Sequence, residues 1–287
     1  METLREKQAK KQFTITVEIN PPKSASPDKA VNQAKELAGK VDAINIADCP
    51  MSNMRMSSIA IASIVKNQTN TDTIFHFTCR DRNSIGIQSE LLGAAALGVE
   101  NILTLGGDKP DHGDHPFATS VFELDSMKLI HLAKTLNSGK DLAGNALDVP
   151  THFYVGTTGN PGADDYSVEA AKLKAKIEAG ADFVQTQPVY DLELAKRYMD
   201  MASQFGKPIM LGLISLKSYK MALYLHNHVP GITLSDTILT RMEKGGKEAG
   251  REIACELLEG LTTIADGVHI MPVNDFETAV YLVNQVR

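Results

Sequence analysis

The sequence has few cysteines, no tryptophan and no long uncharged apolar run. Its three cysteines, Cys49, Cys79 and Cys255, are far apart and form no CxxC pair. This spacing argues against a disulfide framework and against a structural zinc site. No apolar run approaches the ~20 residues that cross a bilayer, and no apolar segment of the kind found in signal peptides follows the charged N-terminus. We therefore expect a cytoplasmic protein that binds no membrane.

Basic residues are also fewer than acidic residues. The chain has 29 lysines and arginines against 35 aspartates and glutamates, which gives a net charge of −6 at neutral pH. This acidic balance argues against nucleic acid as a partner. Hydrophobic residues make up 43% of the 287 positions and charged residues 22%, a composition typical of a globular domain that buries its own core.

Eight short apolar or β-branched runs alternate with longer amphipathic stretches along the whole chain. Apolar strands separated by helices are typical of a parallel sheet covered by helices. Eight such units predict a (β/α)8 TIM barrel in a single domain, and the lack of a GxGxxG motif after the first run argues against a doubly wound sheet. The predicted strands cover residues 13–20, 42–48, 73–79, 100–107, 151–158, 183–189, 208–214 and 267–273.

The spacing of these runs also predicts the domain organisation. We expect residues 1–12 to be an N-terminal extension and residues 13–287 to form the barrel domain. Two intervals, 108–124 and 215–266, are longer than the others and are interpreted as insertions. The first follows the carboxyl end of a strand, where barrel enzymes place their chemistry.

Polar residues gather at the ends of several predicted strands and are expected to converge on one face of the barrel. Glu18 is a candidate acid, because burial raises the pKa of a carboxyl group, although it could equally pair with a cation inside the barrel. His76 also fits a hydrogen-bonded core histidine, and Asp108 follows two glycines. Of Gln185 and Gln187 we expect only one to face inwards.

Two further clusters have alternative interpretations. His112, Asp114 and His115 lie in a loop rich in glycine and proline, for which we expect loop hydrogen bonds and no metal ion. Lys172 and Lys176 are one helical turn apart and share a face. They form either a solvated surface or a clamp for a phosphate or a glutamate tail.

Six segments, in order and covering nearly the whole chain, together resemble the methylenetetrahydrofolate reductase family. The loop GDKPDHGDHPFATSVFELDS is similar to the anaerobe and acetogen branch. The resemblance implies a flavin-containing barrel that reduces the methylene group of 5,10-methylenetetrahydrofolate to methyl. The segments are VEINPP (17–22), FHFTCRDRN (75–83), LTLGGDKP (103–110), NPGA (160–163), KAKIEAGADFVQTQ (174–187) and IMPVNDFE (270–277).

The resemblance assigns roles to residues on the folate side. Glu18 matches the general acid, which helps to open the imidazolidine ring at folate N5 and whose pocket keeps the proton near neutral pH. Asp108 matches the aspartate that contacts the pterin and tunes the flavin, and a buried carboxylate there would stabilise a cationic iminium. Gln187 matches the glutamine that holds the folate, and Tyr219 falls where the family often has a phenylalanine that packs on folate or nicotinamide.

The same resemblance implies a flavin, FAD or FMN, which the barrel has only to position. The expected cofactor-binding residues are His76, Asn160, Glu169, Lys172 and Lys176. The implied partners are the folate substrate and an electron donor, either NAD(P)H or an electron-donating subunit. We also expect a homo-oligomer.

Three positions depart from the family pattern on the flavin side. Ala47 and Ala175 stand where a threonine and an arginine are expected, and Gly106 where threonine or arginine is frequent. Polar contacts of this kind contribute about 0.5–1.5 kcal/mol each, so their loss weakens flavin binding by about one to three orders of magnitude. The alternative function is therefore a flavin-independent methyltransferase that moves a methyl group between a corrinoid protein and tetrahydrofolate. A third possibility is a non-catalytic folate-binding subunit.

Overall fold

The computed structural model describes residues 2–286 and contains a closed barrel of eight parallel strands. Each strand pairs with the next one along the chain, and β8 pairs with β1 to close the barrel. The predicted (β/α)8 barrel is confirmed, because each strand falls within or beside a predicted run. The strands are β1 (Thr14–Ile19), β2 (Ala43–Ile46), β3 (Thr73–Thr78), β4 (Asn101–Leu105), β5 (Tyr154–Gly159), β6 (Phe183–Pro188), β7 (Ile209–Ile214) and β8 (Gly267–Met271).

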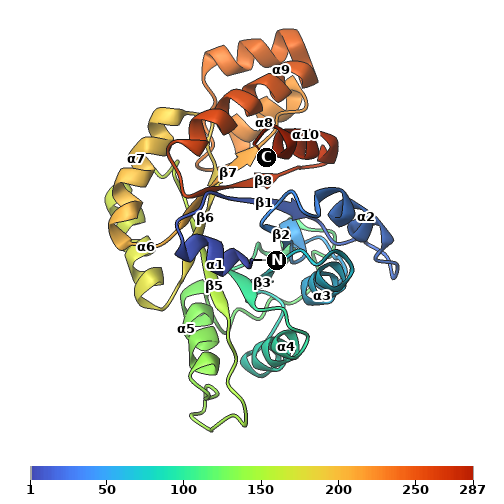
Figure 1. The fold of residues 1–287 in the computed structure, drawn as a ribbon, viewed down its shortest axis with the longest axis vertical. Coiled ribbons are helices and arrows are strands. Elements are labelled where there is room, and N and C mark those ends of the chain that lie inside the picture. The colour runs from blue at the N-terminus through green and yellow to red at the C-terminus, as the bar shows by residue number, and fades with distance from the viewer. Residues whose placement is uncertain (1, 287) are drawn as a thin grey trace.

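Helices cover the outside of the barrel (Figure 1). Within residues 2–286, none of them combines the length and apolar character that a bilayer span requires. The α-helices are α1 (Leu4–Ala9), α2 (Asp28–Leu37), α3 (Ser58–Thr69), α4 (Ser84–Ala96), α5 (Ser126–Asn137), α6 (Tyr166–Glu178), α7 (Leu192–Ala202), α8 (Tyr219–His228), α9 (Asp236–Thr262) and α10 (Phe276–Val286). The short 3₁₀ helices are η1 (Pro50–Ser52), η2 (Pro110–His112) and η3 (Ser203–Phe205).

The segment expected as an N-terminal extension lies across the amino-terminal end of the barrel as α1 (Figure 1). Leu4 is fully buried and packs with Phe183 and Met210 from inside the barrel. Gln8 is also buried, and its Oε1 accepts a hydrogen bond of 2.7 Å from the hydroxyl of Tyr154. Helix α1 therefore closes this end of the barrel. Met1 and Arg287, the outer limits of the expected ranges, lie outside the described residues.

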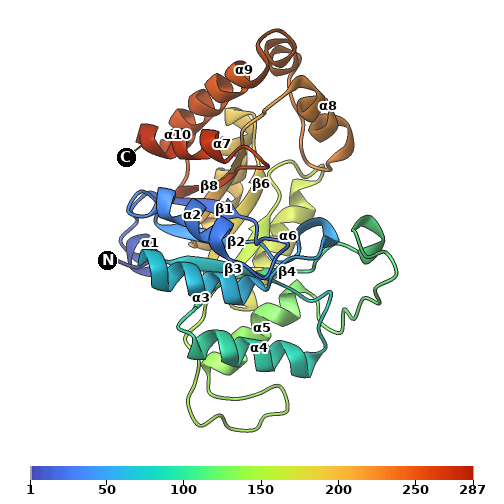
Figure 2. The ribbon, with the colours of Figure 1, turned by 90° about the vertical axis from the view of Figure 1, so that its right-hand side faces the viewer.

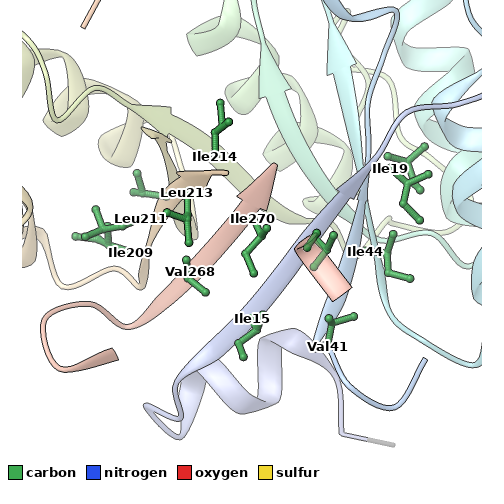
Figure 3. Packing of buried hydrophobic residues seen from close by; sticks show 14 of the residues in the cluster. Ile15, Ile19, Val41, Ile44, Ile209, Leu211, Leu213, Ile214, Val268 and Ile270 are labelled. Atoms are coloured by element: carbon green, nitrogen blue, oxygen red, sulfur yellow. The ribbon is translucent and has the colours of Figure 1, made fainter. Parts of the chain in front are cut away.

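The main core lies between the barrel and its helices. Outward-facing strand residues such as Ile15, Ile44, Leu211 and Val268 are buried in it (Figure 3). Burying each such side chain contributes about 1.5–3 kcal/mol, so this shell stabilises the barrel without using its interior.

Side chains inside the barrel form layers, because alternate residues of each strand point inward. The lowest layer is apolar and includes Ala43, Ile74 and Phe183, which pack beside Leu4 of α1. The layer above it is polar and buried, and it lies directly beneath the carboxyl ends of the strands. We call it the polar layer, and its members are Thr16, Asn45, His76, Gln185 and His269.

The two intervals expected as insertions differ in structure. Residues 215–266 hold α8 and α9, whereas residues 108–124 contain only η2 and otherwise form a loop (Figure 2). Within this loop Asp114 accepts hydrogen bonds from Lys23 Nζ at 2.6 Å and from the backbone N–H of Met54 at 2.9 Å, and it contacts His115 Nδ1 at 2.7 Å. These are the loop hydrogen bonds that the sequence led us to expect.

Candidate functional site

A cavity of about 460 Å³ opens at the carboxyl ends of the strands, immediately above the polar layer. Side chains from β1, β3, β6 and β8 reach it, together with the loops that follow β2 and β4. Its size is typical of a small-molecule site. The polar residues that line it include Glu18, His76, Asp108, Gln185, Gln187 and His269.

Glu18 lies on β1, and its side chain is 19% exposed in the cavity. One carboxylate oxygen is 3.8 Å from Nε2 of His269. Burial acts to raise the pKa of Glu18, but the neighbouring rings of His269 and His76 outweigh it, so the pKa lies below its usual value. The expectation of a raised pKa is therefore wrong for the ligand-free protein, in which Glu18 is a carboxylate at neutral pH.

His76 lies on β3 in the polar layer, with 6% of its surface exposed. Its Nε2 is 2.9 Å from Nδ2 of Asn45. Burial lowers the pKa of His76 to about 4, since the charged ring loses its hydration and only part of that loss is offset by Glu18. His76 is thus a neutral imidazole at neutral pH and stays a hydrogen-bonded core residue while facing the cavity.

The remaining polar-layer residues are joined by short contacts across the barrel. Asn45 Nδ2 donates to Gln185 Oε1 at 2.7 Å, and Gln185 Nε2 donates back to Asn45 Oδ1 at 3.2 Å. Gln185 Nε2 also donates to the hydroxyl oxygen of Thr16 at 3.1 Å. That hydroxyl oxygen lies 2.9 Å from Nδ1 of His269. The chain of contacts therefore runs from His76 through two amides and a hydroxyl to His269.

Both glutamines of β6 line the cavity, so the expectation that only one faces inwards is wrong. Residues two apart on a strand share a face. Gln185 is buried in the polar layer, whereas Gln187 lies one level higher and is exposed at the opening of the cavity. Gln187 is thus free to contact a ligand, while the amide of Gln185 is occupied within the protein.

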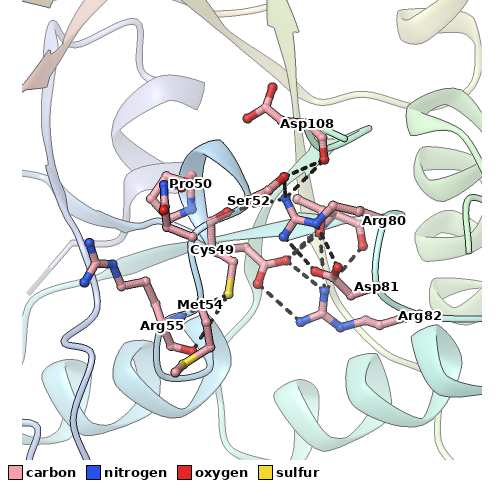
Figure 4. Close-up of polar contacts among 12 residues, drawn as sticks. Cys49, Pro50, Ser52, Met54, Arg55, Arg80, Asp81, Arg82 and Asp108 are labelled. Carbon is pink, nitrogen blue, oxygen red and sulfur yellow. Dashed lines mark hydrogen bonds and ion pairs between the residues drawn. The ribbon is translucent and has the colours of Figure 1, made fainter. Parts of the chain in front are cut away.

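Asp108 lies at the opening of the cavity, and its backbone is held by neighbouring loops (Figure 4). Its carbonyl oxygen accepts hydrogen bonds from Ser52 Oγ at 2.7 Å and from the buried guanidinium of Arg80 at 3.5 Å. The same arginine donates to Ser52 Oγ at 3.1 Å and pairs with Asp81 at 2.7 Å. Asp108 itself is exposed, so the expectation of a buried carboxylate here is wrong.

The loop after β2, which carries Ser52, is strained. Cys49, Met51 and Ser52 have φ values of 43°, 53° and 55°, in the left-handed region that side chains rarely occupy. Strain of this kind persists only where surrounding contacts hold it and clusters at functional sites. Arg80 supplies such contacts, since it donates to the carbonyl of Cys49 at 3.4 Å as well as to Ser52.

Of the five expected cofactor-binding residues, only His76 lines the cavity. Of the other four, Asn160 directly follows β5, and Glu169, Lys172 and Lys176 lie on α6. Glu169 is buried and accepts the backbone N–H of Asn160 at 2.7 Å, and Lys176 Nζ donates to the carbonyl of Thr158 at 2.8 Å. Lys172 is exposed on the same helix.

Two of the three departures from the family pattern also bear on the cavity. Ala47 and Gly106 line it, whereas Ala175 is half-buried on α6. A Cβ added at Gly106 would meet nothing within 4 Å, so that position leaves open space. Tyr219 begins α8 and packs against the main core, and it is not among the residues that line the cavity.

Glu18, His76 and His269 also bring three possible metal ligands within 4.8 Å of one another. Asn45 contacts Nε2 of His76 and Thr16 contacts Nδ1 of His269, so one nitrogen of each ring is engaged within the protein. The sequence led us to expect no metal ion, and we assign none to this site.

The sequence alone did not identify His269, Asn45 and Arg80 as residues of the site. The first two are polar residues at inward positions of otherwise apolar strands, so the period of two was a usable signal. Arg80 follows β3 and gave no local signal, because its role depends on loops that come from β2 and β4.

A family model described as "Methylenetetrahydrofolate reductase" matches residues 3–287. The chain is 27% identical over 229 residues to a probable methylenetetrahydrofolate reductase (NADPH) of Caenorhabditis elegans, across 76% of this chain but 33% of that protein. It is 23% identical over 214 residues to the 5,10-methylenetetrahydrofolate reductase of Pectobacterium carotovorum subsp. carotovorum, across 72% of this chain and 66% of that protein. The chain thus spans about a third of the length of the C. elegans relative.

Solved structures share the barrel at low sequence identity. An uncharacterized protein from Clostridium thermocellum, which binds two copies of 5-methyl-5,6,7,8-tetrahydrofolic acid, aligns with a TM-score of 0.67 at 15% identity, over 99% of this chain and 98% of that chain. An oxaloacetate acetylhydrolase aligns with a TM-score of 0.56 at 10% identity, over 99% of this chain and 84% of that chain. At such identities the likeness shows the fold alone, and one fold hosts many reactions.

Proposed function

The chain belongs to the methylenetetrahydrofolate reductase family, and on that premise we propose that it reduces 5,10-methylenetetrahydrofolate to 5-methyltetrahydrofolate with a hydride from a bound flavin. The observation that carries the proposal is the position of Glu18, which projects into the same cavity that Asp108 and Gln187 line. A folate ligand is supported by the C. thermocellum neighbour, which binds 5-methyltetrahydrofolate on the same fold.

The reaction requires one proton and one hydride. The carbon–N10 bond of the imidazolidine ring breaks, because the product keeps its methyl group on N5. The departing nitrogen, N10 rather than N5, takes up the proton, and the resulting iminium carbon accepts the hydride. Glu18 is placed to hold that proton, and a ligand that covers its exposed fraction would raise the pKa of its carboxyl group by desolvation.

Asp108 and Gln187 are proposed to bind the folate. Both are exposed at the opening of the cavity, so their side chains are available to a ligand. Ser52 and Arg80 fix the backbone of Asp108, so its carboxylate is held near the cavity without being consumed by a protein contact. A negative charge there would stabilise the iminium cation.

The lining of the cavity supports a flavin ring. Ala47, Leu105 and Gly106 contribute small and apolar groups, and a Cβ added at Gly106 would meet nothing within 4 Å. His76, a neutral imidazole, also lines the cavity. Lys176 donates to the carbonyl of Thr158, a residue of β5 that lines the cavity too. When bound, FAD or FMN supplies the hydride; its electrons would come from NAD(P)H or from an electron-donating subunit.

The lack of polar side chains at Ala47 and Gly106 favours a second candidate, a flavin-independent methyltransferase. A cavity without a flavin would leave room above the polar layer for a methyl donor held by a corrinoid protein. The same folate-binding residues, Asp108 and Gln187, would serve that reaction. A non-catalytic folate-binding subunit would make no use of the carboxylate of Glu18.

Two measurements test the proposal. The first is the visible absorption spectrum of the purified protein, before and after incubation with FAD or FMN and desalting. The second is the turnover of 5,10-methylenetetrahydrofolate. Retained flavin bands and turnover that Glu18→Gln abolishes are the expected results. A colourless protein that binds tetrahydrofolate and demethylates a methylcorrinoid protein would replace the proposal with the methyltransferase. Folate binding with neither activity would leave the binding subunit.

A further inference from the structure

We propose that the amide pair of Asn45 and Gln185 is a positioning element that sets the proton positions on both buried histidines, so that His269 presents an Nε2–H to the carboxylate of Glu18. Apart from His76, the residues of the polar layer have no role in the proposed reaction. The structural part of the inference stands independently, whereas its catalytic consequence rests on the proposed function.

The first step is the reciprocal pairing of the two amides. Asn45 and Gln185 exchange two hydrogen bonds of 2.7 Å and 3.2 Å, which uses one N–H of each amide. Both residues are buried, so the second N–H of each needs a protein acceptor. The second N–H of Asn45 points at Nε2 of His76, and that of Gln185 points at the hydroxyl oxygen of Thr16.

The second step follows from these donors. His76 must offer a lone pair at Nε2, so its proton lies on Nδ1. Thr16 is fully buried and accepts from Gln185, so its own hydroxyl proton requires another acceptor. Among the described residues, the contact that meets this need is Nδ1 of His269 at 2.9 Å. His269 therefore carries its proton on Nε2, the nitrogen that faces Glu18 at 3.8 Å.

Rotating both amides by half a turn would satisfy the same contacts with every hydrogen bond reversed. With a neutral ring, that arrangement would turn a lone pair of His269 Nε2 toward the Glu18 carboxylate, which is repulsive. This repulsion selects the arrangement described above for a neutral ring, and it links the direction of the network to the charge on Glu18.

The consequence concerns the proton of Glu18. The groups that act on its carboxylate are His269 from β8 and His76 from β3. The other charged or titratable groups that line the cavity are Asp48 and Cys49 after β2, Arg80 after β3 and Asp108 after β4. Because the network holds an N–H toward Glu18, it stabilises the carboxylate form in the ligand-free protein. Glu18 would then take up its proton only when a bound ligand covers the site. Its protonation would therefore follow substrate binding.

The decisive variant is Thr16→Val, which removes the hydroxyl that joins Gln185 to His269 and keeps the side-chain shape. Thr14→Val is the matched control, because Thr14 is a buried threonine one layer lower on the same strand. Asn45→Ala is a second variant, which acts on His76 should Thr16→Val fail to fold. The readouts are two-bond ¹H–¹⁵N spectra of ¹⁵N-histidine protein, which distinguish the two tautomers, and the pKa of Glu18 from its ¹³C carboxyl signal.

We expect wild-type His269 to be protonated on Nε2 and His76 on Nδ1. Thr16→Val should shift His269 toward a mixture of tautomers and raise the pKa of Glu18 by about one pH unit, whereas Thr14→Val should change neither. Asn45→Ala should mix the tautomers of His76. An Nδ1 proton on wild-type His269, or a Thr16→Val effect no larger than that of Thr14→Val, would overturn the proposal.

Kinetics separate this proposal from the function on which its consequence rests. In a folate-reducing enzyme, Thr16→Val should move the acidic limb of the kcat profile and leave KM unchanged. If the histidine spectra show the expected tautomers but the protein does not turn over the folate, the missing turnover would refute the proposed function. The spectra would still support the positioning network. A pH profile unchanged in Thr16→Val despite altered tautomers would overturn the catalytic consequence.

Discussion

The burial of His76 predicts a specific pH dependence of stability. Its pKa is lowered from 6.5 to about 4, chiefly because the ring is buried. Between these values the unfolded chain binds a proton that the folded protein does not. Stability is therefore lost as the pH falls from about 6.5 to about 4, and the difference of pKa corresponds to about 3 kcal/mol. Glu18, whose pKa is lowered from 4.5, adds its own loss as the pH falls below about 4.5.

His76→Gln isolates this contribution. The Oε1 atom of a glutamine can accept the hydrogen bond of Asn45, so the variant keeps the contact and removes the titration. Urea unfolding near pH 7 and near pH 4.5 should show wild type losing about 2–3 kcal/mol more than the variant over this interval. His152→Gln is the matched control, because His152 is exposed and should leave the wild-type difference unchanged.

Equal pH dependence of wild type and His76→Gln would refute the reasoning. It would mean that the folded protein binds a proton at His76 as readily as the unfolded chain. In that case a charged imidazole would face the cavity, and the hydrogen bond from Asn45 would have to be reversed.

Three further predictions concern the site and the loops around it. Glu18→Gln should lower kcat by about 10²–10⁴-fold and leave folate affinity within a few-fold in titration calorimetry; unchanged turnover would remove Glu18 as the acid. Asp108→Asn should weaken folate binding or slow turnover while the melting temperature stays near that of wild type, since the residue is exposed; a large drop in melting temperature would make it structural. Gly107→Ala should destabilise the protein by about 1–3 kcal/mol, because Gly107 has φ +94° and a Cβ would meet Arg80 and Thr78 at 3.0 and 3.1 Å; equal denaturation midpoints would contradict this.

Several features of this protein follow from the order of residues along the chain. The eight apolar runs predicted eight parallel strands and a closed barrel, because a strand buried on both faces must be apolar nearly throughout. The position of Glu18 near the end of a strand placed it at the carboxyl face, where it lines the cavity. Both predictions depend on local periodicity, which a single sequence contains.

Other features depend on which strands become neighbours in space. Gln185 and Asn45 are 140 positions apart and Thr16 and His269 are 253 apart, yet their side chains meet inside one layer of the barrel. The charge state of Glu18 is decided by that layer, because nearby histidines counteract the burial that alone would raise the carboxyl pKa. Periodicity determines which residues face inward, but only the closed barrel determines what they face.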